Sequence, residues 1–144
     1  MIALSSPLLI GIYQNDRLIE KYEEFGKTSD MLPILFSKIL DNYDIKNIFF
    51  ANGPGSFMAI KVAYIFLKTL STSLNINIFA ADGFCFNNNS PIKAMKKVYF
   101  IKEDKEIITS VIDDEIDNKL ELPEVLKKDL FSTNCDPLYV LPAV

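Results

Sequence analysis

The sequence predicts an α/β fold in which a sheet of short strands has helices on both faces. Two patterns carry this prediction. Short, continuous apolar runs at residues 47–51 and 75–80 alternate with longer segments whose apolar residues recur at helical spacing. Residues 8–25 instead alternate apolar and charged side chains around a polar turn, which indicates an antiparallel hairpin. Because parallel strands are joined by right-handed crossovers, a mixed sheet in a three-layer unit follows.

The predicted sheet has five strands joined by two helices. The strands are expected at residues 2–5, 8–13, 18–25, 47–51 and 75–80. The first helix is expected at 31–40, after N-cap candidates at 28–30, and the second helix is expected at 57–70. Ser56 immediately precedes the second helix, so its hydroxyl is well placed to accept from a free amide of the first turn.

The chain divides into three parts. Residues 1–86 form the main lobe, residues 87–97 a hinge, and residues 98–144 a small second lobe. The hinge is predicted because its asparagines, serine and proline favour turns. In the second lobe we expect a hairpin at 97–112 and a short amphipathic helix at 123–131.

The composition excludes several classes of function. The chain has no histidine, which removes histidine-dependent triads and most catalytic zinc sites. Its formal net charge of −4 argues against direct nucleic-acid binding, because phosphate neutralisation needs a basic surface. Cys85 and Cys135 are far apart in sequence and fit a reduced, cytoplasmic protein, although a single bridge between them stays open. The apolar start lacks the basic region of a signal peptide, and no membrane span is expected because no apolar run reaches ~18 residues.

A glycine turn links the strand at 47–51 to the second helix. Its residues are Asn52, Gly53, Pro54, Gly55 and Ser56. The two glycines can adopt positive φ, and the unpaired amides at a helix N-terminus suit an anion. The alternative is that the turn only reverses the chain. It lacks the Lys and Ser/Thr of a P-loop and the third glycine of a dinucleotide-binding motif, so neither nucleotide-binding motif is matched.

The second helix is apolar on two sides. Lys61 and Lys68 lie on one stripe, and Ala59 and Ala63 lie opposite them, where small side chains let the helix approach a sheet. Large apolar side chains also lie on or beside the lysine stripe, and others widen the apolar stripe of the first helix. Such a surface predicts a second buried interface, against another helix or another chain. The predicted partner-interface residues are Met31, Ile34, Leu35, Phe57, Ile60, Lys61, Tyr64, Ile65 and Lys68.

The segment from Asn52 to Ala63 resembles the GPGSFTGLRxG segment of the TsaB (YeaZ) proteins. These are the non-catalytic subunits of the bacterial machinery that makes N6-threonylcarbamoyladenosine (t6A) in tRNA. Ala59 and Ala63 stand where that family usually has glycine, and Lys61 stands where it has arginine. Residues 137–141 are similar to the family's terminal PxYLR. By these residues the chain resembles a short form of the family.

The resemblance implies an actin-like ATPase (ASKHA) fold of two ribonuclease-H-like lobes, here with a truncated second lobe. It also implies a scaffold that binds the catalytic subunit TsaD through a helical bundle, with the ATPase TsaE joining and a second copy of the chain as the other candidate partner. Ser5, Ser6 and Pro7 stand where ATPase relatives carry an acidic residue. We therefore expect no catalytic residue, cofactor or metal on this chain alone, and we expect ATP and metal on the partner subunits. tRNA is expected to be reached only through the complex.

An enzyme of the same superfold is the alternative interpretation. It would be an ATP-dependent phosphotransferase or a glycoprotease-like enzyme. Such an enzyme requires acidic metal ligands close to Gly53 and Gly55, and Asp82 is the candidate in this sequence. Magnesium-dependent ATP binding by the isolated chain would favour this alternative.

Overall fold

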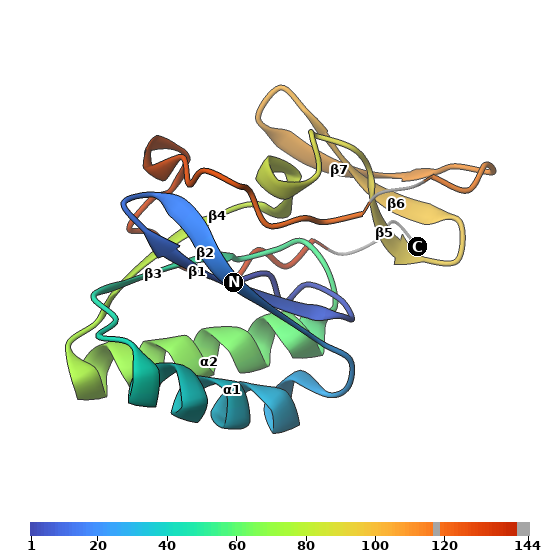
Figure 1. Ribbon diagram of the computed structural model, residues 1–144. Coiled ribbons are helices and arrows are strands. Elements are labelled where there is room, and N and C mark those ends of the chain that lie inside the picture. Colours follow the sequence, from blue (N-terminus) through green and yellow to red (C-terminus); the bar gives the residue numbers. More distant parts are fainter. Residues whose placement is uncertain (117–118, 141–144) are drawn as a thin grey trace.

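The computed structural model describes residues 1–116 and 119–140 (Figure 1). Within these residues the strands are β1 (Leu8–Gln14), β2 (Arg17–Glu24), β3 (Asn47–Ala51), β4 (Asn77–Ala81), β5 (Ile92–Met95), β6 (Val98–Glu103) and β7 (Glu106–Val111). The helices are α1 (Thr28–Asn42) and α2 (Phe57–Leu74), with two short 3₁₀ helices, η1 (Gly83–Phe86) and η2 (Lys128–Leu130). The protein therefore has the predicted α/β class.

The strands form three small sheets instead of the single five-stranded sheet that the sequence predicts. β1 pairs with β2 antiparallel, β3 pairs with β4 in parallel, and β5, β6 and β7 form an antiparallel sheet. The expected first strand is reduced to a bridge, in which Ile2 and Leu9 exchange backbone hydrogen bonds of 2.8 and 3.0 Å. On its other side, the amide of Ala51 donates to the carbonyl of Met1 at 3.0 Å. These bonds hold the amino-terminal residues between the two strand pairs.

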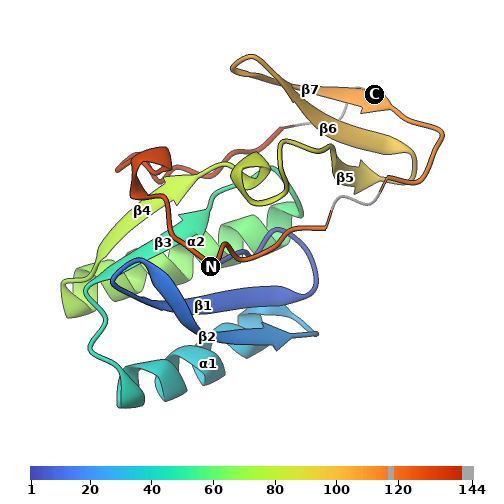
Figure 2. The same ribbon diagram turned by 45° about the horizontal axis from the view of Figure 1, so that its top comes forward.

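Both α-helices lie on one side of β1 to β4, and not on both faces as predicted (Figures 1 and 2). The helices pack directly against each other, and the ring centroids of Phe36 and Phe66 are 5.3 Å apart. Their inner sides bury Leu32 and Leu67 in the main core with the apolar residues of β1 and β3. The expected cap candidates at 28–30 lie inside α1, whose N-cap residue is Lys27.

The opposite face of these strands is covered by the carboxyl-terminal segment, which returns across the main lobe (Figure 1). The amide of Leu18 donates to the carbonyl of Glu124 at 3.0 Å. Further along, Ser132 and Ala80 exchange backbone hydrogen bonds of 2.8 and 2.9 Å. These two β-bridges attach the segment to β2 and β4, and its Phe131 packs against Phe49 of β3, where the sequence predicts a second helix layer.

The β5–β6–β7 sheet lies apart from the strands β1 to β4 and is the regular structure of the part predicted as a second lobe (Figure 2). β5 lies within the predicted hinge of residues 87–97, and the helix expected at 123–131 is reduced to η2. Leu122 and Cys135 pack against the core of the main lobe, whereas Val140 packs against Ile92 and Phe100 of the β5–β6–β7 sheet. Parts of the predicted second lobe and of the closing motif, at 117–118 and 141–144, lie outside the described residues.

Candidate functional site

The glycine turn joins β3 to α2 and has the helix cap that the sequence predicts. Ser56 is the N-cap residue of α2, and its hydroxyl accepts from the amide of Ala59 at 3.4 Å. Gly53 has a φ of +135°, which side-chain-bearing residues adopt only with strain. The Gly53–Pro54 peptide bond is cis. These residues turn the chain from the end of β3 into the first turn of α2.

The chain itself fills the space around both glycines. A Cβ atom on Gly53 would lie 2.4 Å from the carbonyl oxygen of Leu138, and one on Gly55 would lie 2.5 Å from the carbonyl oxygen of Leu4. The amide of Ser56 already donates to that oxygen of Leu4, at 2.8 Å. The glycines are thus required where two other backbone segments come close. The structure favours the turn as a packing element over the anion-binding alternative.

Asn52 fastens the turn to the carboxyl-terminal segment. Its side-chain amide donates to the carbonyl of Asp136 at 2.9 Å, and its backbone carbonyl accepts from the amide of Leu138 at 2.8 Å. Its backbone amide donates to the carbonyl of Ala81 at 3.1 Å. Its side-chain oxygen is buried and has no hydrogen-bond partner among the described residues. One asparagine therefore connects three parts of the main lobe.

Asp82, the carboxylate that the enzymatic alternative requires, is engaged in the packing of the chain. One oxygen accepts from the amide of Phe84 at 3.0 Å and caps η1, and the other pairs with the ammonium of Lys102 on β6 at 2.5 Å. Burial, followed by the charge of Asp82, raises the pKa of the nearby Cys85 thiol. Within residues 1–116 and 119–140, no three His, Cys, Asp or Glu side chains gather where they could hold a metal ion. Asp82 thus joins the two lobes.

Replacing Asp82 by alanine is expected to destabilise the protein by about 2 kcal/mol, because η1 loses its cap and a largely buried lysine loses its partner. Lys102 exposes only 26% of its side chain and Asp82 15%. Chemical denaturation followed by circular dichroism measures the free energy of unfolding. The matched control is Asp44→Ala, which breaks the exposed pair with Lys46 and should change stability by no more than about 0.5 kcal/mol. Equal effects of the two variants would contradict the prediction.

The predicted interface residues separate into exposed and buried groups. Ile34, Phe57 and Ile65 expose 64%, 41% and 53% of their surface, and Lys61 and Lys68 are exposed with them. Met31 and Tyr64 are half-buried and pack against the main core. Leu35 and Ile60 are buried inside the chain's own core, which corrects their assignment to an external surface. Ile60 is buried because Ile2, Leu4 and Ala51 enclose it at the start of α2.

Two exposed side chains next to this surface, Met58 and Tyr139, were not predicted from the sequence. Met58 exposes 68% of its surface and lies seven residues before Ile65, so both share one stripe of the helix. We call Met58, Lys61, Ile65 and Lys68 the outer face of α2. Tyr139 packs edge-on against Phe57, with ring centroids 5.4 Å apart. The seven-residue spacing could have identified Met58, whereas no local signal points to a contact between residues so distant in sequence.

α2 is, by length and composition alone, apolar enough to cross a membrane. The structure shows another use for part of that apolar surface. Ile60, Ala63 and Leu67 are buried in the core of the chain, as a helix that covers a sheet requires. The outer face, with its two lysines, is exposed, as are Phe57 and Leu74 at the two ends of the helix.

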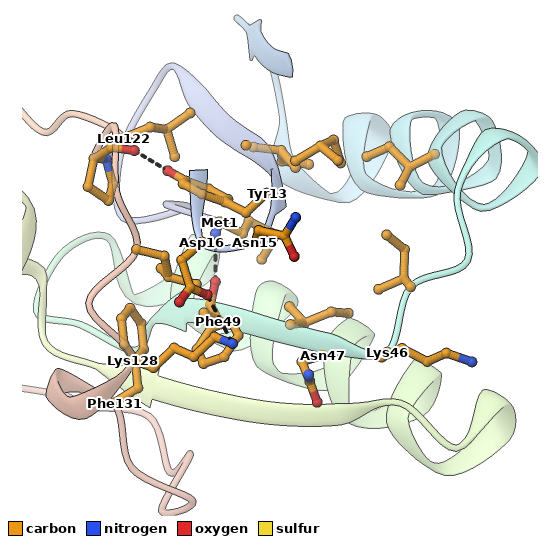
Figure 3. A pocket seen from close by; sticks show the side chains of 18 of the residues that line it. Met1, Tyr13, Asn15, Asp16, Lys46, Asn47, Phe49, Leu122, Lys128 and Phe131 are labelled. Carbon is orange, nitrogen blue, oxygen red and sulfur yellow. Dashed lines mark hydrogen bonds and ion pairs between the residues drawn. The ribbon is translucent and has the colours of Figure 1, made fainter. Parts of the chain in front are cut away.

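A cavity of about 330 Å³ lies between β1 and β3, away from the glycine turn (Figure 3). The hydroxyl of Tyr13 donates to the carbonyl of Pro123 at 2.5 Å and so holds the carboxyl-terminal segment over the cavity. Burial is the main cause that raises the pKa of Tyr13 to about 12. At the exposed mouth, Lys128 pairs with Asp16 at 2.9 Å. No local pattern in the sequence indicates this cavity, because its walls come from distant segments.

No family model and no curated protein matches the sequence. Two solved structures are similar to it. YeaZ from Pseudomonas aeruginosa superposes with a TM-score of 0.60 and 14% identity, over 76% of this chain and 61% of that protein. An uncharacterized protein with similarity to peptidase YEAZ from Pseudomonas aeruginosa gives a TM-score of 0.58 and 13% identity, with the same coverage. The chain thus aligns with less than two thirds of the length of either protein. At these identities the likeness concerns the fold alone, and this chain has an α/β fold similar to that of YeaZ from Pseudomonas aeruginosa.

Proposed function

We propose that the chain is a TsaB-type scaffold, a non-catalytic cytoplasmic subunit of a complex that makes t6A in tRNA. Its partner would be a TsaD homologue, bound through a bundle that includes α1 and α2. The observation that carries the proposal is the outer face of α2, where Met58 and Ile65 expose 68% and 53% of their surface on one stripe. The YeaZ-like fold supports the same role.

The physical argument concerns apolar surface that the chain does not cover. Burying a large apolar side chain is worth on the order of 1.5–3 kcal/mol, so two or three such residues contribute substantially to association. Lys61 and Lys68 lie beside them at the rim of the interface. They would orient the partner through acidic residues on its surface, and would contribute less to the affinity than the apolar residues do. In this proposal ATP and metal lie on the partner subunits, a TsaE homologue joins the complex, and tRNA contacts it only through the assembly. A second copy of the chain would compete for the same face.

The test is co-purification with the TsaD homologue of the same organism. The double variant Met58→Glu with Ile65→Glu is expected to lose the complex, because two carboxylates would be desolvated at the interface. Both positions are exposed, so the fold of the variant should be kept, which circular dichroism checks. Formation of t6A by the reconstituted complex should fall in parallel.

The matched control is Val111→Glu on β7, where the side chain is 68% exposed but lies on the second lobe. It should bind the TsaD homologue as the unmodified chain does. An unmodified chain that forms no complex, or a double variant that still binds, would rule the scaffold role out. The enzymatic alternative gains no support from Asp82, whose two oxygens are engaged within the chain.

A further inference from the structure

Asn52 and Gly53 form the one Asn-Gly pair in the sequence. Such a pair can modify itself, because glycine has no side chain to keep its amide nitrogen away from the asparagine side chain. The nitrogen of Gly53 attacks Cγ of Asn52, so that a bond from this nitrogen to Cγ forms and the bond from Cγ to Nδ2 breaks. Ammonia leaves with the amide proton of Gly53. Water then opens either carbon–nitrogen bond of the cyclic imide, which gives aspartate or isoaspartate.

The folded chain protects Asn52 from this reaction. Nδ2 must leave as ammonia, yet it donates to the carbonyl of Asp136 at 2.9 Å. The carbonyl of Asn52 accepts from the amide of Leu138 at 2.8 Å, and its amide donates to the carbonyl of Ala81 at 3.1 Å. Asn52 exposes only 9% of its surface, so water has little access to it. The reaction therefore requires that Asp136 and Leu138 first lift from the turn.

Neither product fits the closed turn. An aspartate at this position has no side-chain N–H, so its oxygens would face the carbonyl of Asp136. The side-chain oxygen of Asn52 already lacks a hydrogen-bond partner among the described residues, and a buried carboxylate needs such partners far more. Isoaspartate adds a carbon to the backbone of the turn. There is no space for it, because even a Cβ on Gly53 would lie 2.4 Å from the carbonyl oxygen of Leu138.

We propose that Asn52–Gly53 is a self-modification site gated by residues 132–140 of the carboxyl-terminal segment. While these residues are docked, Asn52 stays an amide. When they lift, Asn52 converts to aspartate or isoaspartate, and they can no longer return. A modified chain also loses the contact of Tyr139 with Phe57 at the start of α2. A transient opening thus becomes permanent. The site is independent of the outer face of α2, on which the scaffold proposal rests.

The experiment incubates the full chain in mildly alkaline buffer, with and without urea, and follows conversion at Asn52 by peptide mass spectrometry. In the folded chain the rate depends on the fraction of molecules that are open. Three hydrogen bonds hold Asn52 in place, so conversion should be at least about tenfold slower in the folded chain than in urea. Asn134 is the internal control, because it is exposed but precedes Cys135, whose side chain hinders the attack. In urea it should convert much more slowly than Asn52.

The variant Leu138→Pro tests the gate from the chain side. Proline has no N–H, so this variant loses the hydrogen bond to the carbonyl of Asn52 but keeps the Asn-Gly pair. Leu138→Ala is the matched control, because it loses the same side chain and keeps the amide. Circular dichroism checks that both variants fold. Asn52 should convert about fivefold faster in Leu138→Pro than in Leu138→Ala. If Leu138→Pro does not fold, the comparison of the folded chain with the chain in urea decides.

The variant Asn52→Asp carries one product directly. It should unfold at a lower temperature, and limited proteolysis should cut residues 132–140 faster than in the unmodified chain. The proposal is overturned if Asn52 converts equally fast in the folded chain and in urea, or if it stays an amide in urea. It is also overturned if a folded Leu138→Pro variant converts no faster than Leu138→Ala, or if Asn52→Asp is as stable and as resistant to protease as the unmodified chain.

Discussion

Gly53→Ala is expected to destabilise the protein by about 3–5 kcal/mol, one of the largest effects for a single added methyl group in this chain. Two causes act together. The residue has a φ of +135°, and the new Cβ would lie 2.4 Å from the carbonyl oxygen of Leu138 and 2.8 Å from its Cβ. Leu138 cannot simply move, because its amide donates to Asn52 at 2.8 Å. Chemical denaturation measures the loss as a lower midpoint.

Substitutions at two other glycines measure the backbone strain and the steric collision separately. Gly26 has a similar φ of +133° but meets nothing closer than 3.8 Å, so Gly26→Ala should cost only the backbone strain, about 1–2 kcal/mol. Gly55 needs no positive φ but would place a Cβ 2.5 Å from the carbonyl of Leu4, so Gly55→Ala should cost about 1–3 kcal/mol through collision alone. If Gly53→Ala costs no more than Gly26→Ala, the close approach of the carboxyl-terminal segment is not maintained in solution.

Local patterns in the sequence predicted the features that depend on neighbouring residues. The apolar run Asn47–Ala51 is a strand with the predicted bounds, since a buried parallel strand needs no distant information to be recognised. The cap by Ser56 and the hairpin of β6 and β7 are confirmed for the same reason. Ala63 and Leu67 lie on the buried side of α2, opposite the lysines, as helical periodicity requires.

The features that were missed depend on long-range packing. Periodicity shows that Ile60 lies beside an exposed stripe, but it cannot show that Ile2 and Leu4 cover that end of α2. In the same way, the return of residues 120–140 over the main lobe rests on contacts such as that between Phe131 and Phe49, whose ring centroids are 5.1 Å apart. For the glycine turn, the sequence left open whether it binds an anion or only reverses the chain. The neighbours of its glycines, Leu4 and Leu138, are distant in sequence.

Leu67→Ala is expected to destabilise the chain by about 2–5 kcal/mol, whereas Ile65→Ala should change its stability by no more than about 0.5 kcal/mol. Leu67 is completely buried in the main core, so its truncation leaves a cavity, whereas Ile65 is half-exposed two positions earlier on the same helix. The free energy of unfolding and the affinity for the TsaD homologue are measured on the same samples. Under the scaffold proposal, the free energy of unfolding and the affinity for the TsaD homologue should respond differently to Ile65→Ala. Ile65→Ala should weaken the complex without weakening the fold, because the exposed part of its side chain would be covered only when the partner is bound. If Ile65→Ala lowers the free energy of unfolding as much as Leu67→Ala does, then Ile65 stabilises the fold of its own chain. That result would contradict the assignment of the outer face of α2 to a partner interface.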